Sequence, residues 1–163
     1  MAGTEITIIF VTQRNVSLQM RDHQGHQILF MHKYCGKQNV LEDIYYDLEI
    51  TPPGIRKKDK YYVGYFVGEE LVAVMDLIDG FPNAETAYIG FFMLDINYQG
   101  KGLGTKIITE LFAYLKEVGF HYVRLGYEKD NPQSSHFWKK QGFSSVKEVL
   151  QDGGIIVVAD KCF

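Results

Sequence analysis

The feature that most constrains this chain is a glycine-rich segment, Gln99-Gly100-Lys101-Gly102-Leu103-Gly104, which lies between a strand pattern and a helix pattern. Before it, Ala87–Asp95 (AYIGFFMLD) is a mostly apolar run, typical of a central strand buried on both faces. After it, apolar residues recur at helical spacing from Ile107 to Val118, and Gly119 predicts the end of that helix. With the strand pattern that follows, this order predicts one β-α-β crossover.

The other strand patterns are short and are mostly joined by tight turns, which favours antiparallel pairing. They cover Glu5–Val11, Tyr61–Val67, Leu71–Ile78, His121–Tyr127, Ser145–Leu150 and Ile155–Ala159. Further helices are expected over Val40–Leu48 and after Asn131-Pro132, where asparagine suits the N-cap and proline the first helical position. We therefore predict a single α/β (α+β) domain over residues 1–163, with a mixed, mostly antiparallel central sheet flanked by helices.

Composition narrows the class of protein. The formal net charge of −3 gives no basic field for nucleic acid, so we expect no nucleic-acid partner. The two cysteines, Cys35 and Cys162, are far apart and in no metal-ligand spacing, which argues against a metal site or a disulfide scaffold. The N-terminus lacks a signal-peptide pattern, and no apolar run reaches membrane-spanning length. We therefore expect a cytoplasmic protein without a membrane partner.

The glycine-rich segment is suited to an anionic ligand. The first turn of a helix presents N–H groups without helical acceptors and carries partial positive charge, and glycine lets an anion approach the backbone closely. The spacing does not match a nucleoside-triphosphate P-loop, because Gly104-Thr105-Lys106 replaces its Gly-Lys-Ser/Thr end. It also lacks the third glycine of a dinucleotide fingerprint, since position 105 is Thr. A purely structural turn remains an alternative.

Two motifs carry a resemblance to a known family. Gln99, Gly102 and Gly104 resemble the cofactor motif Gln/Arg-x-x-Gly-x-Gly/Ala of the Gcn5-related N-acetyltransferase (GNAT) superfamily. A second motif of that family, an asparagine, a helix, an aromatic pair and Gly-Phe, is similar to Asn131, Phe137-Trp138 and Gly142-Phe143. The resemblance spans roughly residues 61–143. It implies a GNAT-like fold and transfer of an acetyl group from acetyl-CoA to a primary amine, which we expect to belong to a small molecule.

The resemblance also implies a cofactor site. The strand Ala87–Asp95 is expected to splay from His121–Tyr127, so that backbone near Met93 and Leu94 can pair with the pantetheine amides. The Leu94 N–H is the candidate for stabilising the tetrahedral oxyanion. The cofactor-binding residues implied in this way are Met93, Leu94, Gln99, Gly100, Lys101, Gly102, Leu103, Gly104, Thr105, Asn131, Phe137 and Lys140. Asn131 is also interpretable as a helix cap, Phe137 as core and Lys140 as a solvated residue.

The resemblance identifies the catalytic groups less directly than it identifies the cofactor site. Where many relatives carry a tyrosine acid this chain has Trp138, and where one branch carries a glutamate base it has Tyr88. Asp76 and Tyr88 are therefore the candidates for orienting the amine or a water molecule, and each is also compatible with a structural role. The absence of both familiar groups leaves open a non-catalytic acyl-CoA sensor, and a peptide or protein N-acetyltransferase is a further alternative.

Two expectations concern the protein's partners. Glu42 and Asp43 lie beside the apolar stripe of the helix predicted over Val40–Leu48, and an acidic rim of this kind would attract a cationic amine. Exposed strands could also pair between subunits, which makes a homodimer possible.

Overall fold

The computed structural model describes residues 6–11 and 49–163 of the chain, and within 7–11 it describes the backbone only. The helix predicted over Val40–Leu48, with Glu42 and Asp43, lies outside the described residues. The described chain falls into two compact units. The first comprises residues up to Asp76 together with Phe92–Asn97, and the second comprises Leu77–Phe91 and Tyr98–Phe163.

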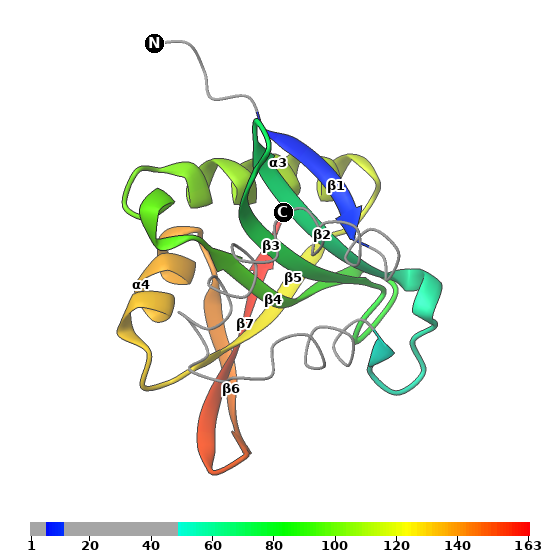
Figure 1. The fold of residues 1–163 in the computed structure, drawn as a ribbon. Coiled ribbons are helices and arrows are strands. Elements are labelled where there is room, and N and C mark those ends of the chain that lie inside the picture. The colour runs from blue at the N-terminus through cyan, green and yellow to red at the C-terminus, as the bar shows by residue number, and fades with distance from the viewer. Residues whose placement is uncertain (1–5, 12–48) are drawn as a thin grey trace. The chain divides into compact units, whose positions relative to one another are not determined.

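The predicted strands form one mixed sheet (Figure 1). The strands are β1 (Thr7–Val11), β2 (Lys60–Val67), β3 (Glu70–Asp79), β4 (Thr86–Leu94), β5 (Tyr122–Glu128), β6 (Ser144–Gln151) and β7 (Gly154–Cys162). They are hydrogen-bonded in the order β1-β2-β3-β4-β5-β7-β6. The β4–β5 pair is parallel, whereas β1–β2, β5–β7 and β6–β7 are antiparallel. This arrangement confirms the mixed, mostly antiparallel sheet with one β-α-β crossover.

The first unit is built around the β2–β3 hairpin. Its strands are mostly apolar, and the side chains of Val72, Ala73 and Met75 are fully buried. The Tyr65 hydroxyl donates to the Met75 Sδ at 3.7 Å. A short 3-10 helix, η1 (Lys57–Asp59), directly precedes β2. It lies in the Thr51–Lys60 segment, which Pro52-Pro53 keeps from continuing as an α-helix.

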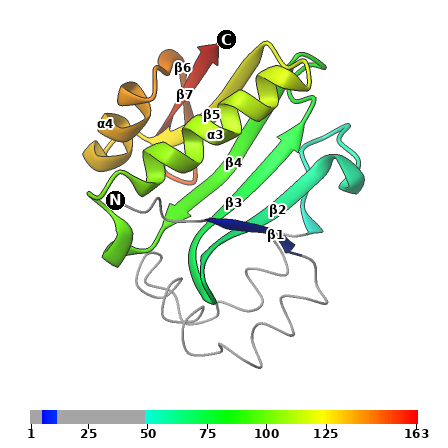
Figure 2. The same ribbon diagram turned by 90° about the horizontal axis from the view of Figure 1, so that it is seen from above.

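The second unit packs two helices, α3 (Leu103–Glu117) and α4 (Pro132–Lys140), with β5, β7 and β6. The predicted apolar stripe of α3 supplies Ile107, Ile108 and Leu115, which are almost completely buried. Phe143, just after α4, joins the helices, because its ring lies 5.9 Å from that of Phe112 in α3 and 5.3 Å from that of Trp138 in α4. Figures 1 and 2 both show α4 beside the N-terminal end of α3.

The parallel β4–β5 ladder ends before the two strands do. Its last pair joins Ile89 to Leu125, although β4 continues to Leu94 and β5 to Glu128. This early end of the ladder is the splay that the resemblance implied. The prediction of a strand buried on both faces holds only in part, because Ala87, Ile89 and Met93 are buried whereas Tyr88 and Phe91 are half-buried and Gly90 is exposed. A strand that loses its partner on one side also loses part of its cover.

Candidate functional site

The glycine-rich turn has a conformation that side chains rarely adopt. Gly100 has φ +70° and Gly102, the N-cap of α3, has φ +82°, in the left-handed region that favours glycine. A Cβ built at either position meets no heavy atom within 4 Å. The first hydrogen bond of α3 runs from the Lys106 N–H to the Gly102 carbonyl, so the three N–H groups before Lys106 precede the helical ladder. The turn is thus an open backbone cradle at a helix start, and it fits an anionic group.

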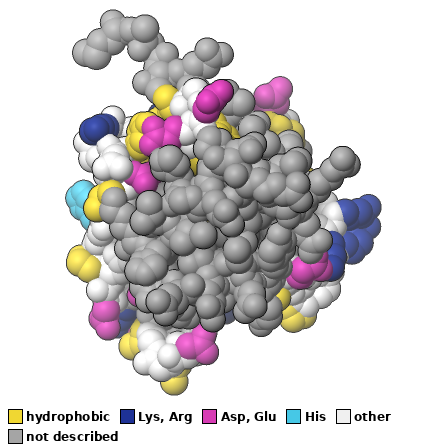
Figure 3. All heavy atoms as spheres, viewed as in Figure 1, with side chains coloured by type: hydrophobic (Ala, Val, Ile, Leu, Met, Phe, Trp, Pro, Cys, Tyr) yellow, Lys and Arg dark blue, Asp and Glu magenta, His cyan; other side chains and the backbone are white. Residues whose placement is uncertain are grey.

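Several cations are found on the elements that carry the turn. Lys101 in the turn is exposed, and Lys106 in the first turn of α3 lies 3.9 Å from Glu110. Lys139 and Lys140, in the last turn of α4, are exposed as well. On the face drawn in Figure 3, the acidic side chains of the described residues lie at several separate places rather than in one acidic field. Lys101 and Lys106 thus supply positive charge at the turn.

Two side-chain hydrogen bonds fasten α4 to the turn. The Gln133 Nε2 donates to the Gln99 Oε1 at 2.8 Å, and the Gln141 Nε2 donates to the Thr105 Oγ1 at 3.1 Å. Gln133 lies in the first turn of α4, and Gln141, which is buried, is its C-cap residue. The two motifs recognised in the sequence are thus held together at both ends of α4. Neither Gln133 nor Gln141 was predicted from the sequence, because no spacing signal distinguishes them from solvated helix residues.

The residues of the second motif differ in exposure and in contacts. The Asn131 Oδ1 accepts a hydrogen bond from the Ser134 N–H at 3.0 Å, which confirms the helix-cap interpretation. Phe137 is half-buried, and its ring lies 4.9 Å from that of Trp138. Trp138 is 6% exposed and is flanked by the rings of Phe137 and Phe143, so it packs as a core residue.

The residues expected to contact pantetheine lie at the end of β4. Met93 is buried and Leu94 is half-buried, and the following Asp95 N–H donates to the Val72 carbonyl at 2.8 Å within the first unit. A single 3-10 turn, η2 (Ile96–Tyr98), then leads to Gln99. Met93 and Leu94 therefore belong to the first unit, whereas the glycine-rich turn belongs to the second.

The two catalytic candidates lie in different surroundings. Asp76 in β3 is 8% exposed, and its Oδ2 lies 3.1 Å from the Nζ of Lys60, which also donates to the Ile50 carbonyl at 2.7 Å. The Asp76 carboxylate is therefore held in a buried ion pair with Lys60. Tyr88 in β4 is half-buried, and its ring packs edge-on against Phe81 with centroids 5.3 Å apart.

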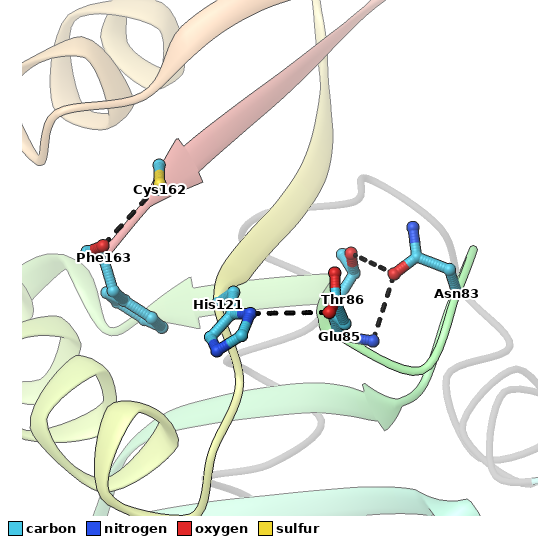
Figure 4. Close-up of polar contacts among 6 residues, drawn as sticks. All are labelled: Asn83, Glu85, Thr86, His121, Cys162 and Phe163. Carbon is cyan, nitrogen blue, oxygen red and sulfur yellow. Dashed lines mark hydrogen bonds and ion pairs between the residues drawn. The ribbon is translucent and has the colours of Figure 1, made fainter.

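Both histidines among the described residues are exposed. His136 lies on the outer side of α4. His121 directly precedes β5. Its Nδ1 is 3.6 Å from Glu85, and its carbonyl accepts from the Phe163 N–H at 3.0 Å; Figure 4 shows His121, Glu85 and Phe163 together. The 15 residues of α3 separate His121 from the glycine-rich turn. At a rise of about 1.5 Å per residue, α3 puts roughly 22 Å between its two ends.

Among residues 6–11 and 49–163, no group of three or more His, Cys, Asp or Glu side chains is arranged to hold a metal ion. In the same part of the chain, every helix is too short or too polar to span a membrane.

The comparisons with solved structures agree on the fold. An acetyltransferase from Thermus thermophilus is 23% identical, with 97% of each chain covered and a TM-score of 0.73. The ribosomal-protein-S18-alanine N-acetyltransferase of Escherichia coli is 14% identical, with 96% of this chain and 92% of that chain covered and a TM-score of 0.67. A GNAT family acetyltransferase from Elizabethkingia anophelis with acetyl-CoA bound is 12% identical, with 97% and 98% covered and a TM-score of 0.63.

The sequence itself gives the family. No curated protein matches this sequence. Residues 22–143 match the model of the acetyltransferase (GNAT) family, which is more than half of the chain and includes both motifs. This match confirms the resemblance and the expectation of an acetyltransferase. A left-handed glycine turn at the start of α3, a splayed β4–β5 pair and the match over residues 22–143 lead to one conclusion: the chain belongs to the acetyltransferase (GNAT) family.

Proposed function

We propose that this protein transfers the acetyl group of acetyl-CoA to the primary amine of a small molecule. The observation that carries the proposal is the open glycine-rich turn at the start of α3, fastened to α4 by Gln133 and Gln141. The family supports the reaction class. The acetyl-CoA bound to the Elizabethkingia anophelis protein, which has the same fold, supports the choice of cosubstrate.

In this proposal the pyrophosphate is held by backbone N–H groups of the turn, with a nearby cation. The pantetheine arm pairs with backbone at the end of β4. The residues assigned to the turn are Gln99, Gly100, Lys101, Gly102, Leu103, Gly104 and Thr105, and those assigned to the arm and its surroundings are Met93, Leu94, Asn131, Phe137 and Lys140. Asn131 serves as helix cap through its Oδ1, and its amide nitrogen supplies the contact.

The proposed reaction is a direct acyl transfer. The neutral amine attacks the thioester carbonyl, the C–N bond forms, the C–S bond breaks, and coenzyme A leaves as a thiolate. The amine proton passes to water, and the Leu94 N–H stabilises the oxyanion of the intermediate. Tyr88 is proposed to orient the attacking amine. We prefer it to Asp76, because the Asp76 carboxylate is engaged by Lys60.

Acetyl-CoA is expected to stabilise the folded protein by mass action. At a ligand concentration of about 100 Kd the gain is about 2.7 kcal/mol, which for a chain of this size raises Tm by roughly 5–10 °C. NAD and ATP should shift Tm much less, because the turn lacks both of their motifs. Thermal melts with each ligand make the comparison, and a calorimetric titration that finds no binding of coenzyme A at millimolar concentration would end the proposal.

The acceptor is identified by turnover. Release of coenzyme A is followed with polyamines, amino acids and aminoglycosides, and in a second arm with short peptides that begin with alanine. The peptide arm is included because the Escherichia coli protein of the same fold is an alanine N-acetyltransferase of ribosomal protein S18. Turnover of a small amine supports the proposal, and turnover of peptides alone replaces it. Tight binding of coenzyme A without any turnover indicates a sensor.

A further inference from the structure

Three side chains from neighbouring strands form a row on one face of the second unit. Tyr88 in β4 is the register partner of Arg124 in β5, and Arg124 is the register partner of Asp160 in β7. Register partners on neighbouring strands point to the same face of a sheet. The opposite face at this level carries Ala87 and Val123, which are fully buried. The three polar side chains of this row therefore lie on the less buried face of the sheet.

The Arg124 guanidinium is fixed by two hydrogen bonds. Its Nε and Nη2 donate to the two carboxylate oxygens of Asp160, each at 2.7 Å, in a bidentate pair. The two side chains are only 22% and 27% exposed. The hydrogen bonds to Asp160 raise the pKa of Arg124 above its ordinary value, and the interaction with Tyr88 acts in the same direction. Arg124 is thus a rigid, permanently charged neighbour of the Tyr88 phenol.

The Tyr88 hydroxyl lies at the level where the β4–β5 ladder ends. A Cβ built on Gly126 would be 3.8 Å from the Tyr88 Oη and 2.9 Å from the Ile156 Cγ2. Gly126 comes directly after Leu125, the last β5 residue paired with β4. A glycine inside a strand often marks a close approach of another group, and here it leaves room for the phenol. Phe81, packed edge-on, fixes the ring from the β3–β4 connection.

We propose that Arg124, clamped by Asp160, is a positioning residue that holds the Tyr88 hydroxyl toward the acceptor amine where β4 and β5 separate. The inference rests on the function proposed above and adds two residues to it. The Tyr88 oxygen accepts a hydrogen bond from the amine N–H, which turns the nitrogen lone pair toward the thioester carbonyl. The C–N bond then forms to give the tetrahedral intermediate, the amine proton passes to water, and the C–S bond breaks as the intermediate collapses and releases the coenzyme A thiolate. Arg124 and Asp160 touch neither reactant.

The test is a double-mutant cycle on Tyr88→Phe and Arg124→Met. The probe is the amine of the panel that the wild-type protein acetylates fastest, and calorimetry gives the Kd of coenzyme A for every variant. We expect kcat/KM for the amine to fall by about 10–100-fold in Tyr88→Phe, the range of a lost orienting group, and by about 10-fold in Arg124→Met. In the double variant the loss should not exceed that of Tyr88→Phe alone, because Arg124 acts through Tyr88.

Further variants separate positioning from folding. Asp160→Asn keeps the shape of the clamp but weakens it, and should lower kcat/KM less than Arg124→Met. Arg124→Lys keeps the charge and should restore part of the loss. Glu85→Gln is the matched control, because it removes a charge near His121 at the other end of the same two strands. It should leave kcat/KM unchanged.

The outcomes are distinct. Coupled losses with a Kd for coenzyme A within twofold of wild type support the inference. Additive losses, or full activity in Arg124→Met, would overturn it while leaving acetyl transfer intact. A wild-type protein that acetylates no amine would overturn the proposed function and this inference with it.

Discussion

Replacement of Trp138 by alanine is expected to lower the free energy of unfolding by about 3–5 kcal/mol, the usual cost of removing a large buried aromatic side chain. The indole is 6% exposed and is enclosed by the rings of Phe137 and Phe143. Its loss leaves a cavity where α4 packs, and the Phe143 ring that reaches α3 loses one of its supports. Urea denaturation of wild type and variant measures the difference.

Trp138→Phe separates packing from chemistry at the same position. An indole N–H cannot protonate a thiolate usefully, so this variant should lose about 1–2 kcal/mol of stability and keep kcat within about threefold of wild type, far from the roughly 100-fold scale of a lost acid. His136→Ala, on the exposed side of the same helix, is the control for general effects on α4. A 100-fold fall in kcat with unchanged affinity for coenzyme A would contradict a role for Trp138 in packing alone.

Gly102→Asn is expected to weaken binding of coenzyme A by about 10–100-fold. Asparagine tolerates the left-handed conformation better than other side chains do, so the turn with φ +82° at Gly102 can persist in the variant. The new side chain projects into the open cradle, and it displaces the pyrophosphate from at least one charge-assisted hydrogen bond of about 1.5–3 kcal/mol. Calorimetric titration with coenzyme A gives the affinity.

Gly153→Asn is the matched control for this change. Gly153, in the β6–β7 turn, has φ +81° and an equally open Cβ position. Both variants should lose a similar, small amount of stability, and only Gly102→Asn should lose affinity. Equal affinities would mean that the glycine-rich turn is structural, which is the alternative left open by the sequence.

The parts of the site that could be predicted are those encoded locally. Gly102 at the start of α3 and Asn131-Pro132 at the start of α4 are recognisable because capping and turn conformation depend on a few adjacent residues. The strand ends were predicted to within a few residues for the same reason, since turn residues flank them. The end of the β4–β5 ladder came from the family resemblance and not from periodicity.

Contacts between distant residues could not be predicted. Gln141 and Thr105 are 36 positions apart, as are Arg124 and Asp160. Single-sequence patterns report which face of an element is apolar, but not which polar side chains meet across it. Asp76 shows the consequence, because its sequence neighbours gave no sign that Lys60 occupies its carboxylate. Trp138 shows it as well, since burial between two aromatic rings is a property of the packed helix.

The hydrogen bonds from Gln133 and Gln141 couple the local opening of α4 to the order of the glycine-rich turn. A short helix of nine residues on the surface opens more readily than the central strands do. Each opening releases Gln99 and Thr105 from one side, so a ligand held by the turn favours the closed helix. Amide protons of α4 would then exchange with solvent more slowly when the turn is occupied. The residence time of the cofactor would be governed in part by how often this helix frays.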